Sequence, residues 1–422
     1  MVKKLKIWHL VLALWIFLVL QRYELLFQSL QLFWLSAQLF FTDYDFISSH
    51  FNFQLVDSIL ALLIMIAIPI ALLLPKPRKK LFDYRLNVSN GFIVFLLFCF
   101  LVPTLFTRQH PDFQQNIGEI KLLPPLSTKY QIELVSNDKS SDGSLRENFL
   151  AVKEKVILKE FDENKFFVRK YSWKDNRLTF TQGINKFSLP ADSIKSIRSE
   201  AIFLGTDEFG RDIFSRLIFG ARISVFIGFM SVIISLILGL TLGFIAATGN
   251  SILSAMLNRL TDLFLSFPSI FLVILILALF GNNLISVIIV LGFSGWMSLY
   301  KIVSGEVASI KRKDYFISSK KIGLSSTELL LKEVIPVIMI PVTVNLVFQF
   351  SNVILAESAL SFLGLGAGNQ YPSWGSMIEK GQEYINSAWW MIFIPGLVLV
   401  LTLLSIHNIA KELNKFFNPK IS

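Results

Sequence analysis

The sequence predicts an all-α polytopic membrane protein that carries one small β-rich insert. Three observations lead to this fold class. Of the 422 residues, 53% are hydrophobic and only 17% are charged, whereas soluble domains carry about 45–50% apolar and about 25% charged residues. The apolar residues gather in eight runs of roughly membrane-spanning length. A long polar stretch, Arg108 to Glu200, interrupts them with short segments that resemble strands.

The first apolar run begins at Ile7, directly after the basic start "MVKKLK", and continues to Leu20 and on towards Leu26. A basic start followed by an apolar run also fits a secretory signal peptide. No strong small-residue cleavage site follows it, and "LSA" at Leu35 to Ala37 is a weak match. We therefore expect an uncleaved helix.

Seven further runs are predicted to cross the membrane. They are Ser58–Leu74, Gly91–Phe106, Ile223–Ala247, Leu260–Phe280, Leu284–Val303, Val334–Leu355 and Ala388–Ile406. With the N-terminus inside, the basic segments Pro75–Lys80 and Lys311–Lys313 and the basic C-terminal tail all fall in the cytoplasm. This positive-inside distribution orients membrane proteins. The net charge of +10 therefore indicates topology, and we expect no nucleic-acid binding.

The polar stretch between the third and fourth runs is predicted to form a small β-rich domain outside the membrane. The segments "KVILKEF", "KFFVRKYSW", "RLTFTQG" and "KFSLP" are rich in β-branched and aromatic residues. The turn-forming triplets "DEN", "KDN" and "GIN" separate them, which is typical of short strands joined by tight turns. Substrate contact, partner docking and a purely structural collar all remain open as roles.

No catalytic or metal-binding pattern is present. The four histidines, His9, His50, His110 and His407, have no ligand spacing, and the single cysteine, Cys99, lies inside an apolar run. A lone cysteine supplies neither a disulfide framework nor a metal site. We therefore expect a protein that is not an enzyme and that holds no metal.

The segment "GTDEFGRD", Gly205 to Asp212, has two glycines five residues apart, as a phosphate-binding loop does. Such a loop continues with Lys and then Ser or Thr, which reach the phosphates and the magnesium ion. Here Arg211 and Asp212 follow the second glycine. Because Asp212 would repel a phosphate, the motif does not indicate nucleotide binding.

The loop between the sixth and seventh runs is basic at first and then helical in pattern. It breaks at Gly323 and resumes towards Pro336, where Ser326 is placed to cap a second helix with Glu328 in its first turn. A helix–glycine–helix element at the cytoplasmic end of the spans has the form of a docking surface. The alternative is a solvated basic loop that only sets topology.

Three polar residues stand on the seventh run at i, i+4 and i+7: Asn345, Gln349 and Asn352. Helical periodicity puts them on one narrow face. Polar groups in hydrocarbon must face other helices or water, so the stripe favours a translocation pathway over hydrogen bonding between helices. Glu357 lies off this stripe, and we prefer a structural role for it.

Small residues also predict close helix contact. Gly239 and Gly243 lie four residues apart in an apolar run, a spacing that allows two helix backbones to approach closely.

Several stretches together resemble one family. They are "LGTDEFGRDIFSRLIFGARISVFIGF", "GWMSLYKIVSGEV", the loop "DYFISSKKIG…VIP" and "LAESALSFLGLG…YPSWGSMI". In order and spacing they resemble the C-type permease subunit of dipeptide/oligopeptide ABC transporters, an inner-membrane component of binding-protein-dependent transport. The resemblance covers roughly Gly91 to Ala410, excluding most of the insert.

The resemblance implies a six-helix ABC importer permease core in the bacterial inner membrane, with both termini cytoplasmic. We expect five domains: residues 1–88 as an extra two-helix hairpin, 89–107 as the first core helix, 108–203 as the insert, 204–410 as the permease core and 411–422 as a cytoplasmic tail. The hairpin and the insert depart from the family's usual pattern. The implied partners are a second permease, two cytoplasmic ATPases that bind the ATP, an extracytoplasmic peptide-binding protein and membrane lipid. The chain itself would hold no cofactor.

Within this resemblance the loop at residues 311–336 is similar to the family's EAA coupling motif. Gly323 and Pro336 match the motif in position, whereas Ile317, Ser318 and Ser319 stand where Glu, Ala and Ala are usual. The missing acid leaves the details of coupling open. The residues implied to couple to the ATPases are Ser318, Ser319, Gly323 and Ser326.

The resemblance also implies roles for the outer motif and for the whole chain. Gly205 and Gly210 would permit tight turns, and Asp207, Arg211 and Asp212 would pair with one another or with neighbouring subunits. We expect import of di- or oligopeptides by alternating access. The alternatives are nickel or peptide-like antibiotics as cargo, or a membrane scaffold or sensor that transports nothing.

Overall fold

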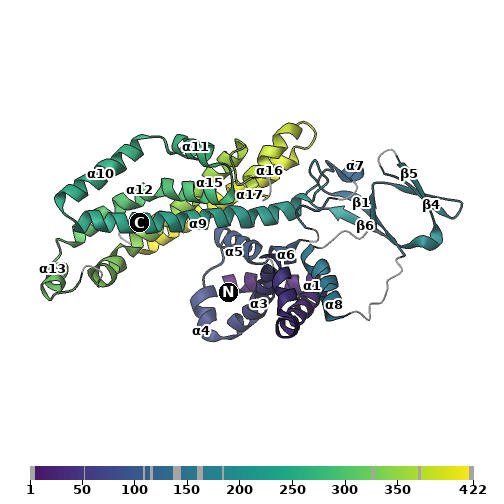
Figure 1. Ribbon diagram of the computed structural model, residues 1–422, viewed down its shortest axis with the longest axis horizontal. Helices are drawn as coiled ribbons and strands as arrows, with labels where there is room; N and C mark the ends of the chain where they lie inside the picture. The colour runs from purple at the N-terminus through teal and green to yellow at the C-terminus, as the bar shows by residue number, and fades with distance from the viewer. Residues whose placement is uncertain are drawn as a thin grey trace. The chain divides into compact units, whose positions relative to one another are not determined.

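The computed structural model describes residues 5–51, 53–107, 110–114, 117–135, 144–158, 165–182, 185–325, 328–368 and 372–417 (Figure 1). Two compact units divide the chain. The first comprises residues 1–222 and 380–395, and the second comprises residues 223–379 and 396–422. Helices α9 (Ile213–Thr248) and α17 (Trp390–Phe417) each contribute to both units.

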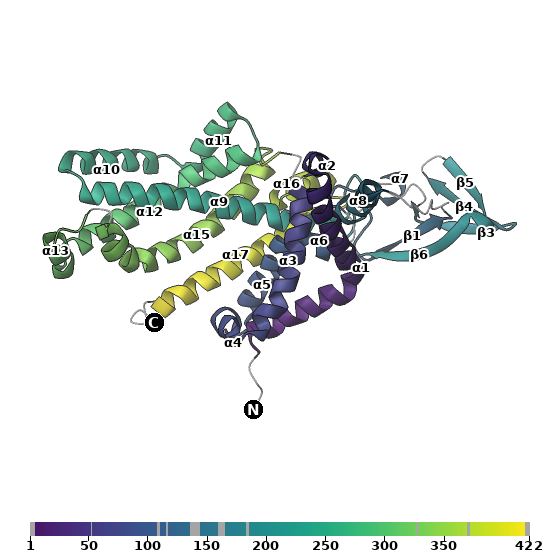
Figure 2. The same ribbon diagram turned by 60° about the horizontal axis from the view of Figure 1, so that its bottom comes forward.

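The first unit begins with a hairpin of α1 (Ile7–Thr42) and α3 (Phe53–Leu73), joined by α2 (Tyr44–His50). Helix α1 is much longer than the predicted run, and it bends at Arg22, whose φ and ψ of −130° and 24° are not helical (Figure 2). The indole of Trp15 donates to the Met65 carbonyl at 2.8 Å. This bond and a shared apolar core hold the two helices together along the hairpin.

The predicted third span is interrupted. After α4 (Pro75–Pro77) and the π-helix η1 (Arg78–Phe82), helix α5 runs only from Val88 to Leu101, and α6 (Pro103–Phe106) is a separate turn. Because Pro103 disfavours a helical conformation at the residue before it, Val102 adopts φ −135° and ψ 52°. With 14 residues, α5 is about 21 Å long, and the continuous helix predicted from Gly91 to Phe106 is wrong.

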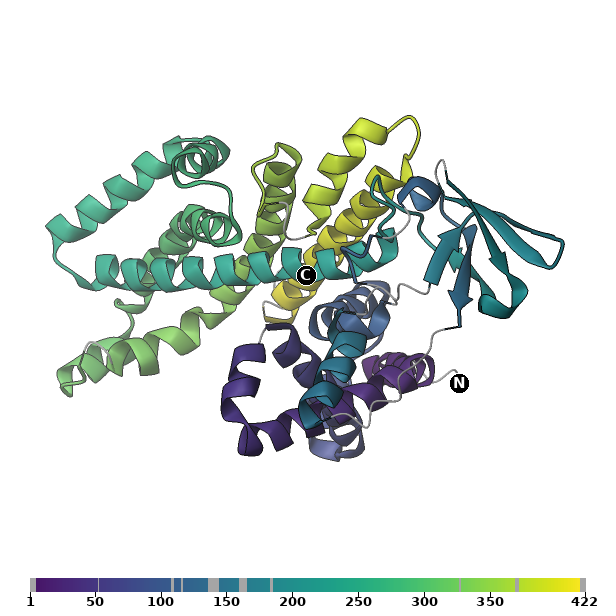
Figure 3. The same cartoon turned by 45° about the vertical axis from the view of Figure 1, so that its right-hand side comes forward.

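Six strands lie in the stretch predicted to be β-rich, and they form two antiparallel three-stranded sheets (Figure 3). The first sheet has the order β2 (Lys165–Val168), β1 (Ser127–Leu134), β6 (Ile194–Ile202). The second has the order β3 (Tyr171–Lys174), β4 (Arg177–Gln182), β5 (Asn185–Pro190). A common core of Ile132, Val168, Leu178 and Phe180 joins the sheets.

The local signals in this domain were mostly correct. The "KDN" triplet is a tight turn, with φ of +50° at Asp175 and +58° at Asn176, the left-handed pair that a two-residue hairpin requires. The strand predicted at "KVILKEF" is wrong, because the described residues of this segment belong to a helix. Here α8 (Leu145–Lys153) continues into the π-helix η2 (Glu154–Leu158). The short elements α7 (Ile117–Ile120), η3 (Ala191–Ser193) and η5 (Gln382–Tyr384) complete this unit.

Helix α8 attaches the insert to the N-terminal hairpin. Phe149 and Val156 are buried in one cluster with Leu32, Leu39 and Leu55 of the hairpin. Arg146 forms an ion pair with Asp43, and Lys153 donates to the His50 carbonyl at 3.0 Å. The insert therefore packs at the end of the hairpin where α1 and α3 are joined, away from the basic segment at Pro75–Lys80.

A second link joins the hairpin to α9. The guanidinium of Arg222 on α9 donates to both carboxylate oxygens of Asp57 on α3, at 2.7 Å for one of the two bonds. Asp57 is buried and Arg222 is largely so. Bidentate pairing of this kind is geometrically specific, so it fixes α3 against the start of α9.

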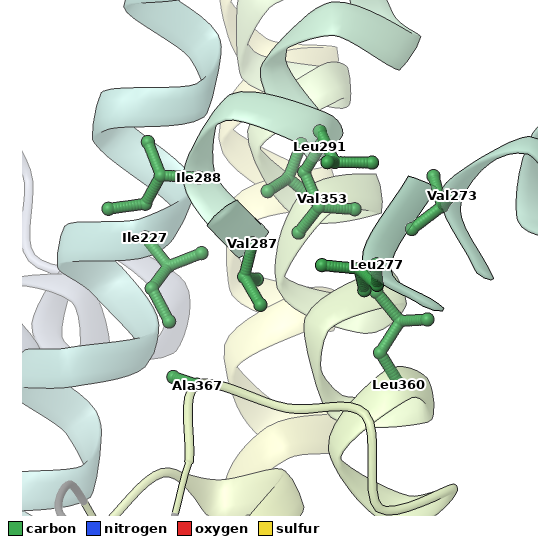
Figure 4. Close-up of a cluster of buried hydrophobic side chains, with 10 residues drawn as sticks. Ile227, Val273, Leu277, Val287, Ile288, Leu291, Val353, Leu360 and Ala367 are labelled. Carbon is green, nitrogen blue, oxygen red and sulfur yellow. The ribbon is translucent and has the colours of Figure 1, made fainter. Parts of the chain in front are cut away.

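The second unit is all helical. After α9 it contains α10 (Ser251–Ser266), α11 (Ser269–Phe280), α12 (Leu284–Ile310), α13 (Asp314–Lys321), the π-helix η4 (Leu329–Val334), α15 (Ile335–Phe362) and α16 (Trp374–Gly381). Its apolar core lies among α9, α11, α12 and α15. Figure 4 shows its side chains, which include Ile227, Leu277, Val287 and Val353.

The predicted fifth span is wrong in shape. Instead of one helix over Leu260–Phe280, α10 and α11 meet at a bend of 89°. Pro268 lies at this bend, where it cannot donate to the helical ladder. Among the described residues, six helices are long and apolar enough to cross a membrane, or up to seven if the bent pair is one span. The eight predicted spans thus include two that are broken or short.

The close helix contact predicted at Gly239 and Gly243 is confirmed. A methyl group built on Gly239 would lie 2.7 Å from Leu299 Cβ, and one on Gly243 would lie 2.8 Å from Val303 Cβ. Helices α9 and α12 therefore touch along a groove that only glycine leaves open. Ser231 and Ser235 of α9 donate across the same contact to the carbonyls of Ile288 and Gly292.

Replacement of Gly239 by Ala tests this contact. Gly to Ala inside a helix ordinarily stabilises by about 1 kcal/mol, but the overpacked contact at Gly239 should instead destabilise by about 1–3 kcal/mol. The matched control is Gly305→Ala on α12, where a built methyl group meets no atom within 4 Å. Thermal unfolding of both variants in detergent should show a lower midpoint for Gly239→Ala only. Equal midpoints would contradict the contact.

Candidate functional site

The loop predicted to be helix–glycine–helix has that form. Helix α13 is anchored by Phe316, which is 4% exposed and packs in one cluster with Val307 and Ile310 of α12 and with Val334. Gly323 ends the helix with a φ of +97°, a conformation that other residues adopt only with strain. The chain then turns back into η4 and α15.

Two polar contacts fix the geometry of this turn. Ser319 Oγ donates to Glu333 Oε1 at 2.9 Å, which ties α13 to η4. Ser325 and Glu328 form a reciprocal cap: the Ser325 N–H donates to Glu328 Oε2 at 3.0 Å, and the Glu328 N–H donates to Ser325 Oγ at 3.3 Å. The Ser325 backbone and hydroxyl lower the pKa of Glu328. Ser326, the predicted cap, lies outside the described residues.

Three apolar side chains of this element are exposed among charged ones such as Lys313 and Lys321. Tyr315 is 43% exposed, Ile317 is 41% exposed and Ile322 is 81% exposed, while Ser318 beside them is also exposed. We call Tyr315, Ile317, Ser318 and Ile322 the loop surface. An exposed apolar patch held by a rigid support is typical of a protein-binding surface.

The predicted polar stripe does not form one open surface in the chain. Gln349 is 9% exposed, and its amide lies against Gly295 so closely that a methyl group there would be 1.9 Å from Nε2. Neither polar atom of this amide has a hydrogen-bond partner within the described part of the chain, and neither does Asn345 Oδ1. Asn352 is exposed. The pathway role of the three residues stays a prediction.

Glu357 is the centre of a buried polar cluster. It is fully buried, and it accepts from Ser361 Oγ at 2.8 Å and from Ser224 Oγ at 3.2 Å. Ser224 Oγ in turn accepts from the Trp374 N–H at 3.4 Å. A buried carboxylate is tolerated only when hydrogen-bonded. Glu357 therefore joins α15 to α9 and to the start of α16.

Close backbone approach makes this cluster possible. A methyl group on Gly375 would lie 2.7 Å from Ser358 Cα and from Ser361 Cβ, and one on Gly366 would lie 2.2 Å from Ser361 Oγ. The sequence placed Glu357 in a structural role, but its serine partners were missed. The serines and glycines around "SALSFLGLG" and "PSWG" were the available signal.

The outer motif "GTDEFGRD" forms a compact charged turn in the first unit. Gly205 and Gly210 have φ of +86° and +74°. Asp207 accepts from the backbone N–H of Arg211 at 2.9 Å and from its Nε at 2.6 Å, and Arg216 adds a longer ion pair to the same carboxylate. The glycine turns and the Asp207–Arg211 pair agree with expectation.

Asp212 does not pair with Asp207 or Arg211, as was one expectation, but bonds to Ser215. Its carboxylate accepts from the Ser215 N–H at 2.8 Å and from the Ser215 hydroxyl at 2.7 Å. An acidic side chain in this position caps the first turn of a helix, here that of α9. Burial raises the pKa of Glu208, the neighbour of Asp207 in this turn.

No cluster of three or more His, Cys, Asp or Glu suited to a metal ion occurs among the residues that the structure describes. The geometry thus consists of a supported apolar loop surface, a buried amide contact and a buried acid cluster.

Comparison with known proteins identifies the family. The model of the binding-protein-dependent transport system inner membrane component matches residues 239–422. The di/tripeptide transport system permease protein DppC of Pseudomonas aeruginosa is 37% identical over 218 residues, which cover 52% of this chain and 72% of the relative. This chain belongs to the binding-protein-dependent transport inner membrane component family.

Other members of this family are similar over the same extent. The dipeptide transport system permease protein DppC of Alkalihalophilus pseudofirmus is 33% identical, covering 55% of this chain and 76% of the relative. The oligopeptide transport system permease protein OppC of Bacillus subtilis is 31% identical, covering 52% and 72%. A solved MetNI methionine ABC transporter chain aligns with 15% identity over 47% of this chain and 95% of that chain. Its TM-score of 0.37 is too low to support an argument.

Family membership indicates the class of protein to which the described sites belong. The chain is a transporter permease component and a multi-pass membrane protein. The matched residues 239–422 contain the loop surface, Gln349 and Glu357, but not the outer motif, the insert or the hairpin.

Replacement of Glu357 tests the buried acid cluster. Glu357→Leu should destabilise by about 2–4 kcal/mol, because the buried hydroxyls of Ser224 and Ser361 lose their acceptor. Glu357→Gln should be milder, since the amide oxygen still accepts. Thermal unfolding of the detergent-purified chain gives both values, with the exposed Glu383→Leu as control. A Glu357→Leu midpoint equal to that of Glu383→Leu would show that the cluster does not stabilise the fold.

Proposed function

We propose that this chain is a permease subunit of a bacterial ABC importer that moves di- or oligopeptides inward. The single observation that carries the proposal is the loop surface, a set of exposed side chains on a helix anchored by the buried Phe316, which lies inside the family match. The substrate class rests on the names of the relatives, which are di/tripeptide, dipeptide and oligopeptide permeases.

The implied assembly contains a second permease chain, two cytoplasmic ATPase subunits and an extracytoplasmic peptide-binding protein. ATP is bound by the ATPases, and this chain contributes no cofactor. The chain lies in the cytoplasmic membrane with both termini inside, which places the basic segment Pro75–Lys80 and the loop surface on the cytoplasmic side, in accordance with the positive-inside rule.

The geometry supports a direct transmission of movement. A partner bound at Ile317 and Ile322 pushes on α13, whose position is fixed by the buried Phe316 and by the Ser319–Glu333 bond. Glu333 lies in η4, which continues directly into α15. Closure of the ATPases would therefore displace α15 and the residues it carries, Asn345, Gln349 and Asn352, and alternate the access of the pathway.

A charged substitution at Ile322 tests docking. Ile322→Asp should weaken the binding of the ATPase subunits by about tenfold or more, because an exposed apolar contact is replaced by a solvated carboxylate. The measurement is the amount of ATPase recovered with the tagged, detergent-purified chain. Leu145→Asp, an equally simple change at an exposed leucine of α8, is the control. Full recovery of ATPase with Ile322→Asp would contradict docking at the loop surface.

Substitution of Gly323 tests coupling. Gly323→Ala introduces strain of about 1–2 kcal/mol at φ +97° without a steric contact, and peptide uptake should fall several-fold while the chain stays in the membrane.

Gly281→Ala is the matched control for Gly323→Ala, because Gly281 also has a positive φ of +84° and open space around it. Sensitivity of cells to a toxic dipeptide reports uptake when this chain is the sole permease of its type. Unchanged sensitivity with Gly323→Ala, or an equal loss with Gly281→Ala, would count against a coupling role and favour a scaffold or sensor.

A further inference from the structure

A pocket of about 510 Å³ lies within the first unit, where the hairpin, α6, the root of the β-rich domain and the outer motif meet. Its polar lining includes Arg22, Lys129, Glu200 and Asp212. Its apolar lining includes Phe17, Leu105, Phe203 and Phe214. This volume and this mixture of apolar walls with a few polar groups are typical of small-molecule sites. The proposed transport function does not use this pocket.

The charged groups in the pocket are two cations and two anions. Lys129 is buried, and its Nζ lies 3.6 Å from Glu200 Oε2 and 4.1 Å from the centre of the Phe167 ring. A separation of 3.6 Å is longer than a charge-assisted hydrogen bond. Burial lowers the pKa of Lys129 in spite of the favourable charges of Glu200 and Asp212. The ammonium is therefore incompletely compensated, and a further anionic group beside it would be stabilised.

The helices that line the pocket indicate its depth in the membrane. Arg22 lies about 22 Å along α1 from Ile7, and Leu105 lies about 25 Å along α5 and α6 from Val88. The hydrocarbon core is about 30 Å thick, and the headgroup region adjoins it. The basic segments flanking Ile7 and Val88 mark the inner end of both helices. At about 22–25 Å from the inner ends, Arg22 and Leu105 lie in the outer part of the hydrocarbon core, about 5–8 Å short of the headgroup region on the side opposite to these segments.

The rim of the pocket is apolar. Phe17 is 54% exposed and Phe203 is 62% exposed, whereas the charged groups Lys129 and Glu200 lie deeper. An occupant that is both charged at one end and apolar at the other fits this arrangement better than a fully water-soluble molecule.

From these contacts we infer that the pocket binds a zwitterionic phospholipid with a primary amine in its head group, such as phosphatidylethanolamine. The phosphate would lie beside Lys129 and Arg22, the amine beside Glu200 and Asp212, and the acyl chains along Phe17, Leu105 and Phe214. This inference does not depend on which substrate the permease carries. It assigns a lipid to the junction between the hairpin and the insert.

Native mass spectrometry of the full-length, detergent-purified chain tests the inference. Phosphatidylethanolamine, phosphatidylcholine and phosphatidylglycerol of the same acyl composition are titrated separately. The wild type should retain one phosphatidylethanolamine with at least about tenfold preference over the other two lipids. Lys129→Met should lose this preference, because one charge-assisted contact accounts for roughly a tenfold change in affinity.

Lys195→Met is the matched control, since Lys195 lies on β6 of the same sheet and pairs with Glu133 at 2.8 Å, but does not line the pocket. Its lipid binding should equal that of the wild type. Glu200→Gln, which keeps the side-chain volume, should weaken phosphatidylethanolamine more than phosphatidylglycerol. It serves as the second variant if Lys129→Met does not fold.

Two results would overturn the inference. Equal retention of all three lipids by the wild type, unchanged by Lys129→Met and Glu200→Gln, would show unselective annular lipid. Displacement of bound phosphatidylethanolamine by millimolar glycylglycine would show that the pocket takes a soluble zwitterion. Neither result concerns transport, so the peptide-uptake assay stands independently of this outcome.

Discussion

The guanidinium of Arg222 on α9 bonds both carboxylate oxygens of Asp57 on α3. Ions in a poorly solvated environment are stabilised only when they are paired and hydrogen-bonded, and removal of one partner leaves the other at a cost of about 3–5 kcal/mol. The N-terminal hairpin is for this reason not an independent addition to the chain. Removal of Asp57 would take two hydrogen-bond acceptors from the Arg222 guanidinium.

This constraint extends from the hairpin to the insert. Helix α8 packs on the hairpin through Phe149, the first sheet begins beside the same helices, and its last strand leads through Gly205 into the outer motif. Asp207 and Asp212 then fix the start of α9, which brings the chain back to Arg222. The hairpin therefore contacts both the insert and the start of α9. The pocket described above lies where these parts meet.

Much of this architecture could be predicted from the sequence because it depends on local patterns. Apolar runs, the "KDN" turn and the glycines at 239 and 243 each have a short-range physical cause. The breaks at Pro103 and Pro268 are also local, but apolar content alone predicts continuous helices across both prolines. The segment around Lys155 was misjudged because a short apolar run fits a strand and a helix equally.

The remaining features depend on partners distant in sequence. Periodicity placed Gln349 on a face but could not show that Gly295 of α12 covers that face. Likewise, the acid Glu357 was visible in the sequence, but its hydroxyl partner Ser224 lies 133 residues away. Such pairs are set by which helices pack together, and no local pattern records that choice.

Exposed apolar side chains have different meanings at different positions in a membrane protein. Along the spans, exposed residues such as Phe229 and Leu279 lie on apolar helices, where lipid or a second permease would cover them. Ile322 is 81% exposed, but it follows Lys321 in a basic loop between the candidate spans Leu284–Ile310 and Leu329–Phe362. Its exposure to water is unfavourable by an amount proportional to its area. A partner protein surface would bury it, and the buried Phe316 and the Ser319–Glu333 bond fix the helix that precedes Ile322. The apolar character of this one loop therefore argues for a partner more strongly than the far larger apolar area of the helices.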